Sequence, residues 1–289
     1  MATIDAASVK QLREMTGAGM MDCKKALVDT EGDLDKAVAL LREKSLASAG
    51  KKADRATAEG AVGVSISEDG KRAGVVEVNC ETDFVARNDQ FRELVSHLAG
   101  HAQQSGSGDA TALLSVASGG DGRTIDQHVR EAIGTLGENI VVSRVAHLET
   151  SGVLGSYTHT DGKQAAVVEV SGEGVDTAKL QQLAKDLAMQ VVALRPQYVS
   201  RDEIPQEVLD AERRIYEQQA AQEGKPEAIQ TKIAEGRLNK EFFQMVALLD
   251  QPFIREQKQS VTQLVKAAGD NIQVKRFVRF RVGETAISA

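Results

Sequence analysis

Few residues in this chain have the type and spacing that catalysis or metal binding requires. His97 and His101 stand four residues apart in a helical pattern, which is the spacing of two metal ligands on one helix face. Glu81 and Asp83 could form a general acid and base pair. No cysteine or carboxylate stands at ligand spacing beside the histidines, and the serine-hydrolase and zinc-protease motifs are absent from the sequence. We therefore expect no covalent catalysis, and neither a metal nor a cofactor bound by the chain itself.

The glycines do not form a nucleotide-binding motif either. The stretch TGAGMMDC, 16–23, is one residue short of the dinucleotide-binding pattern and lies between two helical patterns, so it indicates a helix end. Two Asp-Gly-Lys triplets, 69–71 and 161–163, lack the upstream glycine of a phosphate-binding loop. Both triplets are typical of the tight turn of a β-hairpin.

One stretch combines charged and apolar residues in a different way. NCETDFVARND, 79–89, follows an apolar run typical of a buried strand and precedes a helical pattern. It places Phe84 in a connection, although the chain has only 7 Phe, 3 Tyr and no Trp among 289 residues. A scarce aromatic residue at such a place indicates either a core side chain or a contact surface.

The composition is that of a globular protein, with 42% hydrophobic and 27% charged residues. The net charge of −7, from 35 basic and 42 acidic residues, gives no support for nucleic-acid binding. We find neither a secretory signal pattern nor an apolar run of about 18 residues that could span a bilayer. Cys23 and Cys80 lack CxxC spacing and indicate reduced thiols, although a disulfide between them stays open. We expect a cytoplasmic protein of about two domains.

Three short amphipathic helices are expected in the first fifty residues. Their apolar faces carry Val9, Leu12 and Met15, then Met20, Cys23 and Leu27, then Leu34, Ala37, Val38 and Leu41. Gly32 ends the second helix, and Asp33 is the expected N-cap of the third. Because such narrow faces must pack on one another, we predict a three-helix bundle over 1–50, followed by a tether over 51–60.

The chain then repeats itself at an offset of 92 residues. Residues 63–78 read GVSISEDGKRAGVVEV and residues 155–170 read GSYTHTDGKQAAVVEV, so each copy is a strand, an Asp-Gly turn and a strand. The helix expected after each hairpin carries apolar residues at Phe91, Leu94, Val95 and Leu98, and at Leu180, Leu183, Leu187 and Leu194. We predict an α+β fold with a duplicated core and antiparallel sheets, over 61–150 and over 151–200 with 238–289.

The two copies differ between the second strand and the helix. Leu94 aligns with Leu183 at an offset of 89, so the first copy holds three extra residues, and they fall within 79–89. A duplicated unit needs no such insertion for stability, which favours a function for this loop. Loop drift is the alternative explanation.

Further segments complete the predicted organisation. The Gly/Ser-rich stretch 105–123 is expected to be a flexible connection, and 138–149 a strand that joins the second hairpin. Residues 201–237 form an αα-hairpin, or coiled coil, inserted into the second half of the core. Its expected seam consists of Val208, Ile215, Ile229 and Ile233. Residues 272–284 alternate as a last strand that returns to the sheet.

Three motifs together resemble the bacterial translation elongation factor Ts family. They are LREMTGAGMMDCKKAL near the start, VNCETDFVARND in the middle, and QPF with RFRVGE near the end. The resemblance covers nearly the whole chain. It implies a ubiquitin-associated-type bundle, two core subdomains and a protruding coiled coil. It also implies a guanine-nucleotide exchange factor, whose partner is elongation factor Tu in its GDP-bound and nucleotide-free forms.

The resemblance assigns roles to particular residues. The element that intrudes beside the partner's nucleotide site and displaces its Mg²⁺ corresponds to Thr82, Asp83, Phe84 and Val85. The partner-binding positions correspond to Arg13, Met20 and Met21 in the bundle, and to Gln190, where many members carry histidine. The resemblance implies no direct contact with nucleic acid or membrane, and self-association through the hairpin stays open.

Two other classes of function remain open from the sequence. A three-helix bundle on a tether is typical of a ubiquitin-type or chaperone-linked adaptor, but an adaptor gives no role to the stretch 82–85. An enzyme built on the α+β repeat would have to bind nucleotide or metal itself. Equilibrium titration of the chain with GDP would distinguish that enzyme from an exchange factor.

Overall fold

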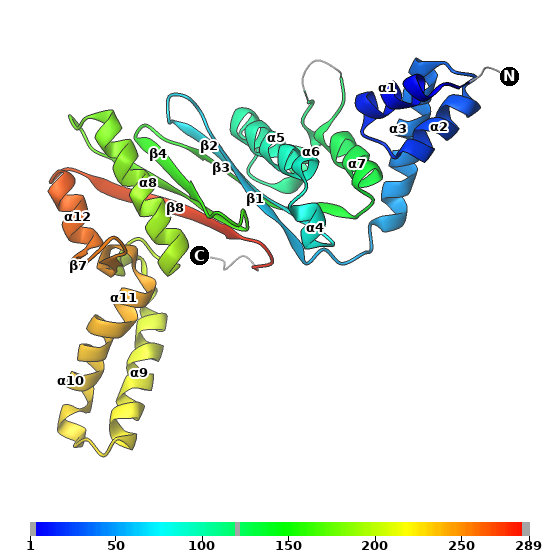
Figure 1. Ribbon diagram of the computed structural model, residues 1–289. Coiled ribbons are helices and arrows are strands. Elements are labelled where there is room, and N and C mark those ends of the chain that lie inside the picture. The colour runs from blue at the N-terminus through cyan, green and yellow to red at the C-terminus, as the bar shows by residue number, and fades with distance from the viewer. Residues whose placement is uncertain (1–3, 119–121, 285–289) are drawn as a thin grey trace. The chain divides into compact units, whose positions relative to one another are not determined.

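The computed structural model describes residues 4–118 and 122–284 as a mixture of helices and small sheets (Figure 1). The α+β class is therefore confirmed. The chain divides into two units, one with residues up to 65, 74–147 and 281–284, and the other with 66–73 and 148–280. The finer five-part division stays a prediction, and its ends at 1–3 and 285–289, like 119–121 of the connection, lie outside the described residues. Among the residues described, no helix is both long and apolar enough to cross a membrane.

The N-terminal bundle consists of three helices: α1 (Ala6–Thr16), α2 (Met20–Asp29) and α3 (Leu34–Lys52). Asp33 caps α3 as predicted, because its Oδ1 accepts a hydrogen bond of 3.0 Å from the N–H of Lys36. The bundle core is formed by Val9, Leu12, Cys23, Ala26, Leu27, Ala37 and Leu41. All of these except Ala26 were predicted to face inward, and the predicted Leu34 and Val38 are partly buried against this core.

Two predictions about the bundle are wrong. Met15 and Met20 are 56% and 55% exposed, because each lies in the terminal turn of its helix, at the edge of the bundle core. The expected tether begins too early, because α3 continues through Lys52. The small side chain of Ala49 is buried against the core of the first sheet, and this packing extends the helix.

The first unit contains a three-stranded sheet in the order β1 (Glu59–Ile66), β2 (Arg72–Cys80) and β3 (Ile140–Glu149). Its core includes residues of α5 (Asp89–Ser105), α6 (Ala110–Ser115) and α7 (Ile125–Leu136). Phe91, Val95 and Leu98 of α5 are buried as predicted.

Two connections of the first unit differ from the prediction. Strand β3 lies beside β2 in the first sheet and does not join the second hairpin. The Gly/Ser-rich stretch 105–123 contains α6, which is capped by the Asp109 side chain. Because Leu113 of this helix is fully buried, this part of the connection is anchored to the core.

The second unit contains a matching sheet in the order β4 (Val153–Thr158), β5 (Gln164–Ser171) and β8 (Gln273–Arg281). The last strand thus returns to the sheet as predicted. Helix α8 (Thr177–Leu194) packs against β4 and β5, and a short pair, β6 (Pro252–Phe253) with β7 (Glu256–Ser260), precedes α12 (Val261–Ala268). Leu194 is 40% exposed and not a core residue, because it is the last residue of α8.

The duplication is visible in equivalent helix-on-sheet contacts. A Cβ atom on Gly63 would lie 2.7 Å from Val95 Cγ1, and one on Gly155 would lie 2.6 Å from Ala184 Cβ. Gly63 and Gly155 are related by the offset of 92, and Val95 and Ala184 by the offset of 89. In both units a helix therefore approaches its first strand at a glycine, since no larger side chain fits there.

The αα-hairpin consists of α9 (Gln206–Gln222) and α10 (Glu227–Arg237), which lie side by side in Figure 1. A π-helical turn, η3 (Leu238–Phe242), leads from α10 into α11 (Phe243–Val246). The predicted seam is wrong at Ile215 and Ile229, which are 46% and 41% exposed, whereas Val208 packs against the buried cluster of the hairpin as predicted. The buried seam is Tyr216, Ala220 and Ala234, since small residues let the two helices approach closely.

The hairpin tip should be dispensable for folding, whereas its inner half should not. Tyr216 and Ala234 belong to a buried cluster with Leu238 and Phe242, but the tip beyond them does not. Replacing residues 218–232 with a short Gly/Ser turn should preserve a single cooperative thermal transition in calorimetry. Tyr216→Ala should lower the unfolding free energy by about 3 kcal/mol, because it opens a cavity in the cluster. Loss of the cooperative transition in the shortened variant would contradict this division.

Candidate functional site

The three extra residues of the first repeat lie in a structured loop. Residues 81–88 connect β2 to α5, whereas the shorter segment 172–176 connects β5 to α8. Within the longer loop, Asp83–Ala86 form the one-turn helix α4, and Thr82 is its N-cap. The insertion therefore adds a helical turn that the second copy does not have.

Helix α4 holds two side chains inward and presents one outward. Ala86 is buried, and Val85 packs against the core cluster of the first unit. Phe84 is 83% exposed, so it is not a core residue. Single exposed apolar side chains are common on protein surfaces, but this one lies on a turn that the second copy lacks. Its place on the inserted turn therefore favours a contact with another molecule.

Asp83 also remains accessible on α4. One of its carboxylate oxygens lies 3.0 Å from Nη2 of Arg87, and the two side chains are 40% and 72% exposed. An ion pair between exposed side chains contributes little free energy, so a partner can replace Arg87 at small cost. The turn thus offers a ring and a carboxylate at adjacent positions.

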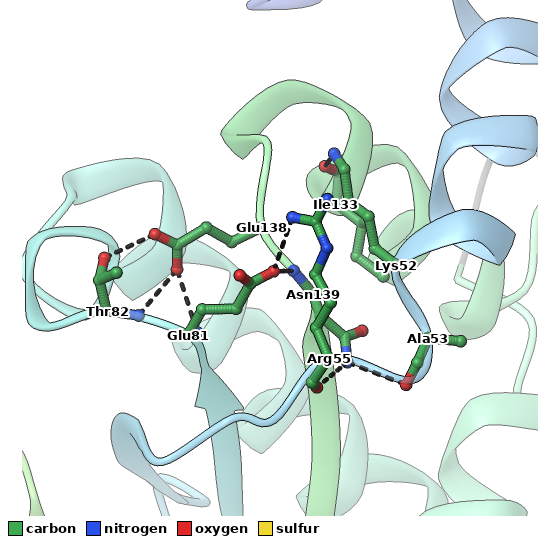
Figure 2. Close-up of polar contacts among 8 residues, drawn as sticks. All are labelled: Lys52, Ala53, Arg55, Glu81, Thr82, Ile133, Glu138 and Asn139. Atoms are coloured by element: carbon green, nitrogen blue, oxygen red, sulfur yellow. Dashed lines mark hydrogen bonds and ion pairs between the residues drawn. The ribbon is translucent and has the colours of Figure 1, made fainter.

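Two carboxylates hold the beginning of this loop (Figure 2). The Glu138 carboxylate accepts hydrogen bonds from the backbone N–H groups of Glu81 and Thr82, at 3.0 Å each, and from the Thr82 hydroxyl at 2.5 Å. The Glu81 carboxylate accepts from the N–H of Asn139 at 2.7 Å and from Arg55 at 3.3 Å. The hydrogen bond from the Asn139 N–H, with support from Arg55, keeps the pKa of Glu81 below its usual value.

The sequence did not indicate Glu138 or Asn139 as site residues. Glu138 follows the left-handed Gly137 at the end of α7, and Asn139 stands before β3. Glu138 meets Thr82 across 56 residues of chain, and no local pattern marks such a contact. The only signal was two polar residues, EN, between a helix-ending glycine and an apolar strand.

The candidate partner-binding residues of the bundle are exposed. Arg13 lies in the last turn of α1, and Met20 and Met21 begin α2. Met21 is 73% exposed, and Val28, seven residues further along α2, is 56% exposed. Adjacent exposed methionines suit an adaptable binding surface. They lie on different elements from the turn that carries Phe84.

The predicted contact of Gln190 with a partner does not agree with its position in the second unit. Its side chain is fully buried in α8. The amide nitrogen donates to Gln251 Oε1 and to the carbonyl of Pro252, each at 3.1 Å, and the amide oxygen accepts from the N–H of Ile254 at 2.9 Å. Because its polar atoms are used internally, Gln190 positions the segment around β6 and is not available to a partner.

The residues with catalytic or metal-binding potential form no metal site among those that the structure describes. His97 and His101 face one another with their Nε2 atoms 3.0 Å apart, and burial, with His97 and His128 nearby, lowers the pKa of His101. Within 4–118 and 122–284, no group of three or more His, Cys, Asp or Glu residues is arranged to hold a metal ion. Cys23 and Cys80 are buried thiols, so the alternative of a disulfide between them is wrong.

Comparison with known proteins gives one consistent result. The family model described as elongation factor TS matches residues 81–284. The chain is 47% identical over 281 residues to elongation factor Ts of Aquifex aeolicus (strain VF5), which covers 95% of this chain and 96% of that protein. It is 46% identical over 292 residues to elongation factor Ts of Nitratidesulfovibrio vulgaris (strain DP4), covering 98% and 97%. It is 45% identical over 290 residues to that of Thermobifida fusca (strain YX), covering 98% and 100%.

Proposed function

The chain belongs to the elongation factor Ts family, and we propose that it is the guanine-nucleotide exchange factor of elongation factor Tu. In this role it binds the GDP-bound partner, displaces Mg²⁺ and promotes GDP release, so that GTP can bind during translation elongation. The single observation that supports this role best is the exposed Phe84 on a turn anchored by Val85 and Ala86.

The geometry of this turn suggests how release is accelerated. A GTPase holds GDP largely through Mg²⁺ and through backbone N–H groups around the phosphates. Insertion of the Phe84 ring between packed elements of the partner shifts those groups. The adjacent Asp83 carboxylate perturbs the water shell of the Mg²⁺ ion. No covalent bond is made or broken in these steps, so the chain acts without covalent chemistry.

The energetic requirement is that the chain binds nucleotide-free partner more tightly than GDP-bound partner. This coupling is reciprocal. If the bound factor weakens the affinity of the partner for GDP, bound GDP weakens the affinity of the partner for the factor by the same ratio. Arg13, Met20 and Met21 supply affinity for the partner, while the loop 81–88 supplies the difference between its two states. In this proposal the bundle binds the partner, and the loop displaces the Mg²⁺ ion and the nucleotide.

The remaining parts of the proposal follow from this role. A factor that acts on elongation factor Tu works in the cytoplasm and needs no contact of its own with nucleic acid or membrane. Ile215 and Ile229 are exposed on the hairpin and offer a surface for self-association. Gln190 is left out of the partner contacts because its side chain is buried.

The test is to mix the chain with elongation factor Tu that carries a fluorescent GDP analogue, in excess unlabelled GDP. Release should accelerate with the concentration of the chain and reach a plateau, and the nucleotide should be recovered chemically unchanged. A release rate that does not depend on the chain contradicts the proposal. Saturable binding of GDP to the chain alone would instead support a nucleotide-dependent enzyme.

Asp83→Asn should slow stimulated release by about tenfold in millimolar Mg²⁺, because it removes the charge that competes for the metal's water shell. After chelation of Mg²⁺ the defect, taken as the ratio of parent to variant, should shrink toward one. Asp89→Asn, at the exposed first residue of α5, is the control and should match the parent in both conditions. A defect of equal size with and without Mg²⁺ would contradict the role of Asp83 at the metal.

A further inference from the structure

The loop that carries Phe84 is held by a residue outside the loop. We propose that Glu138 is a positioning residue, which fixes the backbone of residues 81–85 so that Phe84 is presented in one orientation. This inference rests on the proposed function for its meaning, but its structural part can be tested without the partner. Figure 2 shows the Glu138 side chain directed at the start of the loop.

Glu138 satisfies backbone groups that otherwise have no helical partner. The N–H groups of Glu81 and Thr82 precede α4, and both donate to the same Glu138 oxygen, Oε2, at 3.0 Å. Hydrogen bonds to a carboxylate are stronger than those between neutral groups. The carboxylate thus fixes two successive peptide units immediately before the turn.

The second oxygen of Glu138 orients the N-cap. The Thr82 hydroxyl donates to Glu138 Oε1 at 2.5 Å and accepts from the N–H of Val85 at 3.4 Å. A hydroxyl group has a single proton, so donation to Glu138 leaves a lone pair free for Val85. The cap of α4 therefore depends on a residue that lies 56 positions further along the chain.

A reciprocal contact keeps Glu138 itself in place. Glu81 accepts from the N–H of Asn139, while Glu138 accepts from the N–H of Glu81. The Asn139 side chain is buried and donates to the carbonyls of Ala53 and Arg55, at 3.2 and 2.9 Å. The turn at 138–139 is thereby tied to the loop and also to the segment that follows α3.

This arrangement matters because α4 is too short to be stable by itself. A single helical turn has an unfavourable nucleation free energy and few internal hydrogen bonds. Phe84 has no anchor of its own, since its ring is exposed, so its direction follows the backbone. Val85 and Ala86 anchor the end of the turn, so without Glu138 its beginning would sample more conformations, and ordering it would then oppose insertion into the partner.

The experiment measures both the loop and the release of nucleotide, with Glu138→Ala in the full chain. Hydrogen exchange by mass spectrometry should show the backbone amides of Glu81 and Thr82 exchanging about tenfold faster, because both lose their acceptor. The amide of Val85 should also exchange faster, because its acceptor, the Thr82 hydroxyl, is no longer oriented by Glu138. The maximal rate of stimulated GDP release should fall about tenfold, while the half-saturating concentration changes less than about twofold, because the bundle still grips the partner. Glu138→Gln keeps one oxygen acceptor and should lie between Glu138→Ala and the parent.

Glu169→Ala is the matched control. Glu169 is also half-buried and accepts from a threonine hydroxyl, that of Thr150 at 2.6 Å, but it belongs to the second unit. It should lose stability without changing loop exchange or the maximal rate. If Glu138→Ala shows no cooperative unfolding transition, it is not folded and cannot be used. Glu138→Gln then tests the proposal, and should show faster loop exchange and a lower maximal rate than the parent.

Unchanged exchange in the loop overturns the proposal, and so does an equal fall in the maximal rate for Glu169→Ala. If the parent chain does not stimulate release, the proposed function fails. The exchange measurement still decides in that case whether Glu138 holds the loop.

Discussion

Phe84→Ala should lower the maximal rate of stimulated GDP release by about 10- to 150-fold, which corresponds to about 1.5–3 kcal/mol for the burial of one phenylalanine side chain. The ring contributes this free energy only where it is inserted into the partner, since it is 83% exposed in the free chain. For the same reason, thermal unfolding of the variant should match that of the parent. Stopped-flow fluorescence at saturating factor, together with calorimetry, measures both quantities.

Phe91→Ala provides the opposite case on the neighbouring helix. Phe91 is fully buried in α5, so its removal should cost about 3–5 kcal/mol of unfolding free energy. Where the Phe91 variant remains folded, its maximal release rate should stay near that of the parent. If Phe84→Ala releases nucleotide at the parent rate, Phe84 does not displace anything in the partner. If it destabilises the chain as Phe91→Ala does, Phe84 has a packing role that its exposure does not reveal.

The position of Phe84 in a loop could be predicted because the chain contains a second copy of the same unit with which the first can be compared. The second repeat lacks the turn, so comparison of the two copies within the sequence is enough to locate the insertion. The core strands and helices could be predicted for a related reason. Burial on a sheet or on one helix face leaves a regular apolar pattern, and here the pattern occurs twice.

Contacts between distant or small residues leave no such pattern. The seam of the hairpin is formed by Tyr216 with Ala220 and Ala234, and alanine is common on every helix face. Ile215 and Ile229 gave a stronger apolar signal, yet they are exposed.

Polar residues in the core escaped prediction for a similar reason. Gln190 lies within an apolar helix, and only the tertiary structure shows that Gln251 and the chain around β6 satisfy its amide. Glu138 is not in the core but escaped prediction as well, because its hydrogen-bond partners are 56 and 57 residues away. A polar side chain inside an apolar run, such as Gln190, therefore identifies a position that needs a partner, but not which partner.

Met21→Glu should separate binding of elongation factor Tu from displacement of its nucleotide. A charge placed in a contact that becomes desolvated costs about 3 kcal/mol when it has no partner, which is about 100-fold in affinity. Met21 is 73% exposed in the free chain, so the substitution should not change thermal unfolding. A point substitution is preferable to deletion of residues 1–50, because that cut would remove Ala49 from the core cluster.

The half-saturating concentration of the Met21→Glu factor should therefore rise by about 100-fold, while the maximal rate of GDP release stays near that of the parent, because the loop with Phe84 is intact. This is the reverse of the result expected for Phe84→Ala, and the same release assay at increasing factor concentration measures it. Met245→Glu makes the same substitution at a methionine of α11 that is 60% exposed and has no proposed contact, so it should change neither value. If Met21→Glu abolished release at saturation while binding of elongation factor Tu stayed at the parent level, the bundle would be part of the displacing element. The division between a gripping bundle and a displacing loop would then be wrong.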